Sequence, residues 1–296
     1  MISILIPVYN CFADNLVTEL HRQATGSGKE FEIIISDDAS LEEFRNINAR
    51  LQDLPYVSYH QQEKDLKRAG NRNFLGQQAK YPYLLFIDGD ALVASDDFLI
   101  KYLACCQGRV VVCGGTGYLK DPPADPDHFL RWFYGWRREV KSAATRNRNP
   151  GASFSAFNFL IERSVFLENR FPGDIRDYGH EDTIFGLQVA GEGYAIKHID
   201  NKLIHSGIET NREFLDKSLQ AVANLYQLLT DREFSSYMTG IRIARWYLFC
   251  EKSGIYLLLR LLYPCIKKLA EHNLFSLKPD MFLFDLYRLS YMLRLS

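Results

Sequence analysis

Short apolar runs alternate with helix-like segments through the first part of the chain. Five of these runs are rich in β-branched and aromatic residues, as buried strands are: ISILIPV, FEIIIS, VSYH, YLLFI and RVVVCGG. Four helix-like segments lie between them: residues 16–24, 41–52, 68–79 and 96–106. This alternation predicts an α/β fold built on a mainly parallel sheet flanked by helices.

The pattern changes between residues 120 and 150. A Pro/Asp-rich stretch, DPPADPD, precedes an aromatic and basic one, FLRWFYGWRREV, and a polar one, ATRNRNPG. This composition predicts a long and mobile excursion from the sheet. The sheet resumes with a strand in SFSAFNFLI and a short helix from Glu162, and residues 177–207 predict a loop, a helix, a glycine turn and a strand.

The C-terminal region differs from the rest in pattern and in charge. Apolar residues recur there at alternating spacings of four and three, which predicts an amphipathic helix: Leu215, Leu219, Val222, Tyr226 and Leu229. Residues 240–296 carry nine Lys and Arg against four Asp and Glu, although the whole chain has a formal net charge of −1. We therefore expect two domains, residues 1–212 and a helical, basic, amphipathic extension at residues 213–296.

The extension leaves two interpretations open. Its segments RIARWYLFC, GIYLLLRLLYPCIKKLA and MFLFDLYRLSYMLRL are too interrupted by charge to span a bilayer, yet too apolar to be bare in water. They either pack on the first domain or on a second copy of the chain as a homodimer, or lie on an anionic membrane surface.

Composition sets the broad class of the protein. A chain of 296 residues with 47% hydrophobic residues can bury a large core. Its six cysteines form no CxxC pair, which indicates reduced thiols, and its N-terminus lacks the features of a signal peptide. We expect a cytoplasmic protein, in solution or peripheral on the inner face of the membrane. No nucleic-acid partner is expected.

Polar residues follow three of the predicted strands, where the carboxyl ends of a parallel sheet bind ligands. They are Tyr9 and Asn10, Asp37 and Asp38, and Asp88 and Asp90. Two carboxylates as close as Asp88 and Asp90 repel each other, and a divalent cation would offset that cost. Mg²⁺ and Mn²⁺ favour such oxygen ligands. The alternative is that these aspartates only form turns or cap helices.

Five ordered stretches in about residues 1–212 resemble family 2 glycosyltransferases of the GT-A fold. They are ISILIPVYN, EIIISDDAS, KRAGNRNFLGQQA, YLLFIDGDAL and GHEDTIFGLQVAGEGY. The resemblance implies an inverting transfer of a sugar from a nucleoside diphosphate donor, assisted by Mn²⁺ or Mg²⁺.

The resemblance also implies roles for residues that would bind the donor. Pro7, Val8 and Tyr9 would line the nucleobase pocket, and Asp38 would accept a hydrogen bond from uracil, which favours a UDP-sugar. Arg72 and Asn73 would lie near the diphosphate, although they could equally form a solvated helix face. Asp88 and Asp90 would hold the cation against the phosphates. His205 would complete the metal shell, with a structural histidine as the alternative.

The stretch GHEDTIFG would supply the catalytic base. The resemblance assigns this role to Asp182, with Glu181 as a neighbour that orients the substrate. The alternative is that both acids only stabilise the N-terminus of a helix.

The chain departs from the commonest pattern of the family in two places. SDDAS lacks the usual glycine after the aspartate pair, and no QxxRW motif of processive synthases follows the base. The second departure favours addition of a single sugar over polymerisation. We expect the acceptor to be a glycan or a lipid-linked glycan, in surface polysaccharide synthesis, and the basic amphipathic extension is the support for a lipid-linked one. A catalytically inactive nucleotide-sugar binding protein and a haloacid dehalogenase-like phosphatase, whose strand also ends in Asp-x-Asp, remain the alternatives.

Overall fold

The structure is a computed structural model that describes residues 1–173, 175 and 178–296. The chain forms two compact units. The first unit contains Met1–Leu119, Glu139–Ile175 and Glu181–Gly207, and the second contains Lys120–Arg138, the short segment that ends at His180, and Ile208–Ser296. The domain division at residue 212 stays a prediction.

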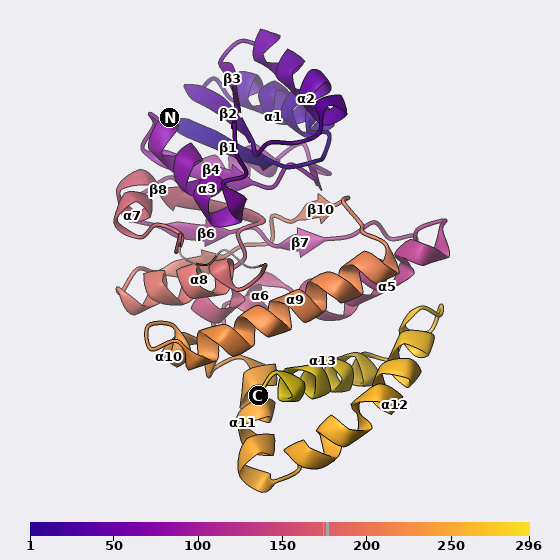
Figure 1. Cartoon of the computed structure of the whole chain (residues 1–296). Helices are drawn as coiled ribbons and strands as arrows, with labels where there is room; N and C mark the ends of the chain where they lie inside the picture. The colour runs from indigo at the N-terminus through magenta and orange to yellow at the C-terminus, as the bar shows by residue number, and fades with distance from the viewer. Residues whose placement is uncertain (174, 176–177) are drawn as a thin grey trace. The chain divides into compact units, whose positions relative to one another are not determined.

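A sheet of seven strands forms the centre of the first unit, in the order β3-β2-β1-β4-β8-β6-β9 (Figure 1). The strands are β1 (Ile2–Val8), β2 (Phe31–Asp37), β3 (Val57–Gln61), β4 (Tyr83–Ile87), β6 (Val111–Cys113), β8 (Asn158–Glu162) and β9 (Ile196–His198). β8 runs antiparallel to β4 and β6, and the other pairs are parallel. The predicted α/β fold with a mainly parallel sheet is confirmed.

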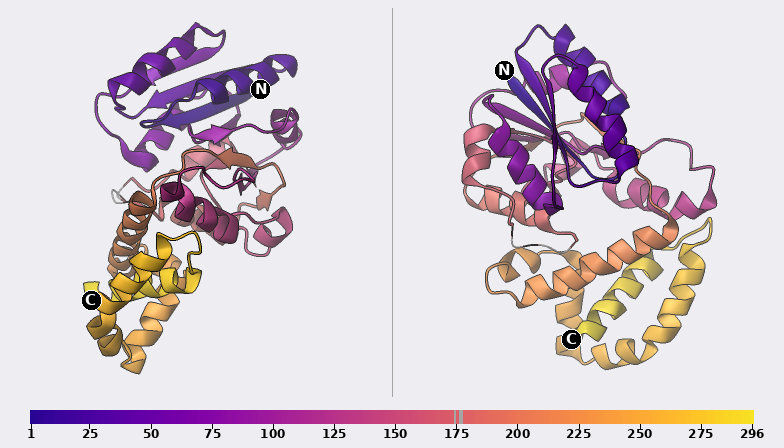
Figure 2. Two further views of the ribbon diagram at one scale, coloured as in Figure 1. Left: turned by 90° about the vertical axis from the view of Figure 1, so that its right-hand side faces the viewer. Right: turned by 45° about the horizontal axis from the view of Figure 1, so that its top comes forward.

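Helices of the first unit cover both faces of this sheet (Figure 2). They are α1 (Asp14–Gly26), α2 (Glu42–Asn48), α3 (Lys67–Gln78), α4 (Phe98–Leu103), α6 (Ala143–Arg146), α7 (Arg163–Glu168) and α8 (Glu181–Gly191), with the 3₁₀ helices η1 (Ala49–Asp53) and η4 (Gly151–Ser153). A second sheet of three short strands has the order β5-β10-β7. Its strands are β5 (Ala91–Leu92), β7 (Thr116–Gly117) and β10 (Leu203–His205).

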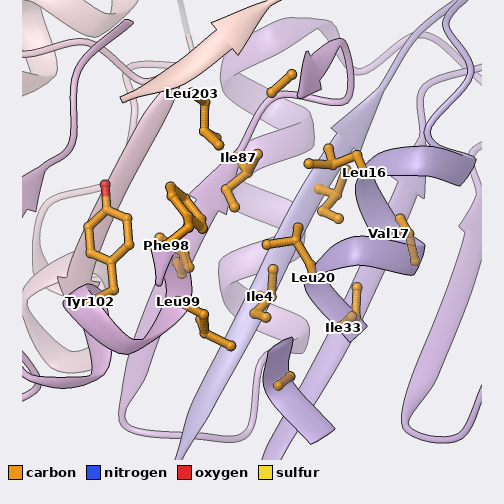
Figure 3. Close-up of a cluster of buried hydrophobic side chains, with 14 of the residues drawn as sticks. Ile4, Leu16, Val17, Leu20, Ile33, Ile87, Phe98, Leu99, Tyr102 and Leu203 are labelled. Atoms are coloured by element: carbon orange, nitrogen blue, oxygen red, sulfur yellow. The ribbon is translucent and has the colours of Figure 1, made fainter. Parts of the chain in front are cut away.

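The strand sequences explain why the sheet is buried on both faces. Successive side chains of a strand point to opposite faces, so a continuous apolar run serves two cores. In β1, Ile4 packs with α1 and α4 on one face, whereas Leu5 packs with α3 on the other. Figure 3 shows the first of these cores, where Ile4 and Ile87 of the sheet face Leu20 of α1.

The second unit is helical. Its elements are η2 (Pro126–His128), α5 (Phe129–Tyr134), α9 (Asn211–Thr230), α10 (Ser235–Met238), α11 (Arg242–Ser253), α12 (Tyr256–Leu274) and α13 (Met281–Leu295), and the π-helical turn η3 (Gly135–Glu139) follows α5. α12 and α13 lie side by side (Figure 2). Their apolar sides and that of α9 share one core. No helix in the described part of the chain has the length and apolar character that a membrane span requires.

Two predictions about local structure can now be assessed. The amphipathic helix predicted around Leu215 to Leu229 is α9, which begins with a capping box formed by Thr210 and Glu213. The excursion predicted at residues 120–150 contains η2, α5, η3 and α6. Its apolar residues explain the difference, because Leu130 and Tyr134 of α5 pack in the core of the second unit.

Glycines hold α8 close to η4. A Cβ atom at Gly186 would overlap the side chain of Phe154 and would lie 2.7 Å from the carbonyl oxygen of Gly151. At Gly191, on the same helix, a Cβ atom would meet no atom within 4 Å. Because α8 begins with Glu181 and Asp182, this close packing also fixes the position of those two acids.

We predict that Gly186→Ala lowers the free energy of unfolding by about 1 to 3 kcal/mol, because the added methyl group overpacks the contact. Gly191→Ala should be neutral or stabilising by up to about 1 kcal/mol, because alanine has the higher helix propensity. Urea denaturation of both variants measures the difference. Equal stabilities would contradict the packing argument.

Candidate functional site

The carboxyl ends of β1, β2 and β4 are joined by backbone hydrogen bonds. The amide of Asp38 donates to the carbonyl of Val8 at 2.8 Å, and the amide of Gly89 donates to that of Pro7 at 3.2 Å. Gly89 has no room for a side chain, since a Cβ atom would lie about 3 Å from Pro7, Val8 and Cys11. The end of β1 therefore lies between the first aspartate pair and the Asp88-Gly89-Asp90 turn.

The three residues predicted to line a nucleobase pocket differ in exposure. Val8 is 1% exposed and belongs to the core, so its side chain is not available to a ligand. Pro7 is half-buried, and Tyr9 is 58% exposed. Of the three, Tyr9 offers the largest accessible apolar surface for a flat ring.

The two aspartates after β2 have different partners. Asp37 accepts hydrogen bonds from the amide of Ser40 and the hydroxyl of Tyr59, both at 2.8 Å, which makes it a structural residue. Asp38 accepts one from the amide of Leu66 at 2.6 Å. Burial raises the pKa of Asp38 to about 7, the Leu66 amide opposes this rise, and the Asp65 carboxylate adds to it. A buried carboxylate at this strand end therefore retains acceptor capacity for a ligand.

Arg72 connects two of the predicted site regions. Its guanidinium is 4% exposed, and Nη2 donates to Oδ1 of Asp88 at 2.6 Å. Nη1 lies 3.9 Å from Oε1 of Glu181, and the guanidinium lies 5.6 Å from the centre of the Phe171 ring. Nε and Nη1 form no hydrogen bond with the described residues. Arg72 is thus a buried cation whose Nε and Nη1 donors have no hydrogen-bond acceptor among the described residues.

Asn73, the neighbour of Arg72, is engaged elsewhere. Its amide group exchanges two hydrogen bonds with the backbone of Phe171, at 2.9 and 3.0 Å. This interaction holds Phe171 against Arg72. The second N–H of the Asn73 amide remains for a phosphate, although these bonds fix the orientation of the side chain.

The small sheet brings His205 beside Asp90. The antiparallel register of β10 and β5 pairs His205 with Ala91, the residue after Asp90. His205 Nε2 lies 3.5 Å from Oδ2 of Asp90. Gly207 leaves room for this carboxylate, because a Cβ atom at residue 207 would collide with it.

The surroundings of His205 fix its ring. Tyr118 and Phe157 pack near it, with ring centres at 5.7 and 5.3 Å. Its Nδ1 is buried and has no hydrogen-bond partner among the described residues. The imidazole is thus held in place with one nitrogen unsatisfied and the other toward Asp90.

The predicted metal residues suit a shared cation better than a closed cage. Among the described residues, no three His, Cys, Asp or Glu side chains gather as a complete metal site. Mg²⁺, however, is usually held by one or two carboxylates together with substrate phosphates and water. Asp90, His205 through Nε2, and the nearby Asp88 fit that kind of partial shell.

Glu181 and Asp182 lie in the first turn of α8. Glu181 is 6% exposed and points to Arg72, whereas Asp182 is half-buried. Burial, followed by the Glu181 carboxylate, raises the pKa of Asp182 to about 6, and the positive charge of Arg72 limits this rise. A carboxylate with this pKa is suited to accept a proton near neutral pH.

The model of the family described as "Glycosyl transferase family 2" matches residues 3–169. The chain belongs to glycosyltransferase family 2. The resemblance inferred from the sequence motifs is confirmed. Membership of glycosyltransferase family 2 also argues against the phosphatase alternative.

Curated relatives of this glycosyltransferase family 2 chain include two proteins named validoxylamine A glucosyltransferase. The one from Streptomyces hygroscopicus subsp. limoneus is 30% identical over 221 residues, and the match covers 65% of this chain and 48% of the relative. The one from strain 5008 of subsp. jinggangensis is 31% identical, and the match covers 65% of this chain and 52% of the relative. The chain thus spans about half the length of the curated relatives it matches.

Solved structures of glycosyltransferases share the fold. A mannosyltransferase from Pyrobaculum calidifontis, in complex with GDP-Man and Mn²⁺, aligns with 83% of this chain and 69% of its own, at 16% identity and a TM-score of 0.54. The alignment with TarS from S. aureus, in complex with UDP-GlcNAc, covers 97% of this chain and 89% of the TarS chain, at 15% identity and a TM-score of 0.52. The predicted GT-A-type fold with a helical C-terminal extension is confirmed.

Several residues around the site escaped the sequence analysis of this family 2 chain. Tyr118 and Phe157 lie far from His205 in sequence, and nothing in their own neighbourhood marks them. Leu66 contacts Asp38 through its backbone, which any residue could do. Gly207 offered a weak signal, because it follows His205 by two residues.

We predict that Asp38→Asn stabilises the protein above neutral pH. Because the pKa of Asp38 rises from 3.8 to about 7 on folding, the stabilisation that its protonated form provides is present below pH 4 and is lost as the pH rises through 7. Asparagine stays neutral and retains an acceptor for Leu66, so the free energy of unfolding at pH 8 should increase by about 1 to 4 kcal/mol.

Urea denaturation at pH 4 and pH 8 tests this expectation. The difference between Asp38→Asn and the parent chain should shrink at the lower pH. Asp53→Asn, at an exposed carboxylate, is the control and should change little at either pH. A loss of stability at pH 8 in Asp38→Asn would contradict the raised pKa.

Proposed function

We propose that this protein transfers a single sugar, with inversion, from a UDP-sugar to a glycan or a lipid-linked glycan acceptor in surface polysaccharide synthesis. The observation that carries the proposal is the position of Arg72, between Asp88 of the Asp-x-Asp turn and Glu181 of the Glu-Asp pair. One buried cation thereby connects the residues assigned to the leaving diphosphate with those assigned to the attacking hydroxyl. The transferred group would be a hexosyl or N-acetylhexosaminyl residue.

Asp38 and Tyr9 support a uridine nucleotide. Uracil presents an N–H from which a carboxylate can accept a hydrogen bond, and Tyr9 is exposed enough to stack on a flat base. TarS was solved with UDP-GlcNAc, whereas the mannosyltransferase was solved with GDP-Man. The choice of base is therefore a property to be measured for this chain.

A divalent cation, Mn²⁺ or Mg²⁺, would be held by Asp88, Asp90 and His205. When bound, it offsets the negative charge that develops on the leaving diphosphate. The mannosyltransferase with this fold contains Mn²⁺, which supports the assignment. The position of His205 Nε2, 3.5 Å from Oδ2 of Asp90, supports it independently.

Arg72 would bind the diphosphate once the donor exposes its guanidinium, which is 4% exposed in the free protein. Its Nε and Nη1 are buried without hydrogen-bond partners among the described residues, which costs free energy unless a ligand satisfies them. Phosphate oxygens accept such charge-assisted bonds. Binding of the donor would thus satisfy groups that the protein leaves unpaired.

Asp182 would take the proton from the acceptor hydroxyl as that oxygen attacks the anomeric carbon. Inversion follows because the attack comes from the face opposite the leaving diphosphate. Glu181 is nearly buried, so we assign it to positioning: it faces Arg72 and raises the pKa of Asp182. Its effect on the acceptor would act through these two residues.

We predict that Asp90→Ala abolishes the Mn²⁺-dependent part of UDP binding while the fold survives, because the Asp90 carboxylate is partly exposed and contributes little to the core. Asp88→Ala should weaken this part of UDP binding less sharply, and it should also lower the free energy of unfolding because it removes the partner of the buried Arg72. Calorimetric titration of UDP with and without Mn²⁺ measures this. Asp96→Ala is the matched control, since its side chain is 92% exposed on the following loop. If both variants bind UDP in Mn²⁺ as tightly as the parent, the metal assignment is wrong.

We predict that Asp182→Asn lowers the transfer rate by about two to four orders of magnitude, the usual contribution of a positioned base. UDP affinity should stay near that of the parent, because the base does not contact the nucleotide. In the parent, the rate should fall as the pH drops below about 6, where Asp182 becomes protonated. Steady-state kinetics on a UDP-sugar panel with Mn²⁺ provides the measurement.

One experiment tests the function as a whole. Release of UDP from UDP-sugars in Mn²⁺, with water as a slow substitute acceptor, should be detectable in the parent and lost in Asp182→Asn. Binding without any turnover would favour the inactive nucleotide-sugar binding protein. If Asp182→Asn turns over as fast as the parent, another residue must be the base.

A further inference from the structure

The outer side of α12 exposes a continuous row of leucines. Five of them are between 41% and 77% exposed: Leu257, Leu258, Leu261, Leu262 and Leu269. At 3.6 residues per turn they cover an arc of about 140°. The opposite side of the helix packs into the core of the second unit through Tyr263, Ala270 and Leu274.

α11 adds exposed aromatic groups directly before α12. Trp246 and Phe249 are 55% and 53% exposed, and their rings lie edge to face with centres 5.8 Å apart. The two helices are joined through Gly254, whose φ of 74° provides the left-handed turn that ends α11. Exposed apolar side chains of this size, gathered on neighbouring helices, mark an interaction surface.

Positive charge accompanies this apolar surface. α11 and α12 carry six Lys and Arg, at residues 242, 245, 252, 260, 267 and 268, against Glu251 and Glu271. Both acids are engaged within the second unit: Glu251 accepts from the Tyr247 hydroxyl at 2.5 Å, and Glu271 pairs with Arg212 at 3.0 Å. The surface is therefore basic as well as apolar.

A groove of about 930 Å³ lies along the C-terminal half of α12. Five of its lining residues can carry positive charge: Arg212, Lys267, Lys268, His272 and Arg294. One acid, Glu271, also lines the groove and pairs with Arg212 and Lys267, which leaves the groove with an excess of positive charge. Lys268 forms no ion pair with the described residues, and it lies next to Leu269 of the leucine row. Cationic groups of α9, α12 and α13 thus line a groove next to Leu269, at the C-terminal end of the leucine row.

We propose that the surface formed by α11, α12 and this groove docks on an anionic lipid membrane. The leucines and Trp246 would enter the boundary between headgroups and acyl chains, and the groove would take lipid phosphate groups. Each Lys or Arg that reaches an anionic surface adds to the affinity. The proposal goes beyond the proposed function, because it assigns a lipid ligand to a surface on which no sugar chemistry depends.

The charge distribution favours lipid over a second copy of this chain. In a symmetric dimer the same surface meets itself, so the basic borders of two copies would face each other. An anionic membrane offers an apolar layer and negative charge together. The Lys and Arg of α12 suit a helix that lies on the membrane surface. No described helix has the length and apolar character that a membrane span requires.

Co-sedimentation of the full chain with phosphatidylcholine vesicles, with and without phosphatidylglycerol, tests the proposal. Binding should require the anionic lipid and should weaken at about 0.5 M salt, where screening shortens the reach of charges to a few Å. Equal binding to both vesicle types would overturn the role of charge. No binding to anionic vesicles at low salt would overturn the proposal.

Paired variants locate the surface. Leu257→Gln with Leu261→Gln should lower the vesicle partition coefficient about a hundredfold, since two apolar side chains no longer leave water. Ile47→Gln with Ile100→Gln, at exposed apolar positions of the first unit, is the matched control and should bind as the parent does. If both pairs bind equally, the leucine row is not the docking surface.

A second pair tests the groove. Lys267→Gln with Lys268→Gln should lower partition into anionic vesicles about tenfold or more, whereas Lys29→Gln with Lys197→Gln, exposed lysines of the first unit, should not.

Light scattering measures the oligomeric state and so tests the alternative of self-association. Suppose that the parent is a dimer that does not bind vesicles, and that the double variant Leu257→Gln with Leu261→Gln is a monomer. That result would assign the surface to self-association instead. UDP binding should be the same in all variants, which separates this proposal from the proposed function.

Discussion

The burial of one guanidinium determines how the candidate site is arranged. A charged group as enclosed as Arg72 is tolerated only if opposite charges accompany it, and removing one partner of such a group is strongly destabilising. Arg72 lies on α3, Asp88 follows β4, and Glu181 begins α8, so a single side chain relates three separate elements. The close packing of α8 at Gly186 then keeps Glu181 within reach.

The carboxylates of Asp88, Glu181 and Asp182 lie near this guanidinium. Burial raises the pKa of Asp182, the Glu181 carboxylate adds to the rise, and the positive charges of Arg72 and Arg68 oppose it. Two consequences follow for a family 2 glycosyltransferase. A divalent cation would be attracted to the side of Asp88, and Asp182, if it is the base as proposed, would accept a proton near neutral pH. The crowding of carboxylates would thus contribute to the proposed reaction.

The sequence predicted those features that depend on long, regular patterns. The strands β1, β2 and β4 are continuous apolar runs, and the acids that follow them could be placed at one edge because parallel strands align their ends. The three-stranded sheet was not predicted, since β5 and β7 are two residues long and have no periodicity to detect. It is nevertheless this sheet that pairs His205 with the residue after Asp90.

Ala39 shows a different limit of sequence reasoning. The missing glycine in SDDAS was noted as a departure from the family pattern, and Ala39 adopts a φ of 60°, in the left-handed region that glycine favours. The turn is therefore kept despite a local cost of about 1 kcal/mol or more. The sequence did not predict the helices within residues 120–150. The composition of this stretch is typical of a loop, but the tertiary contacts of α5 stabilise a helix there.

Pro264 has a consequence for how long the protein would remain at a lipid surface. Proline has no amide hydrogen, so the carbonyl of Arg260, one turn earlier in α12, lacks its usual intrahelical partner. In hydrocarbon an unsatisfied carbonyl costs several kcal/mol, whereas at the headgroups water satisfies it. The middle of the helix must therefore stay hydrated, which limits immersion to a shallow depth. A shallow anchor dissociates readily, so the enzyme could leave one patch of bilayer and sample another between turnovers.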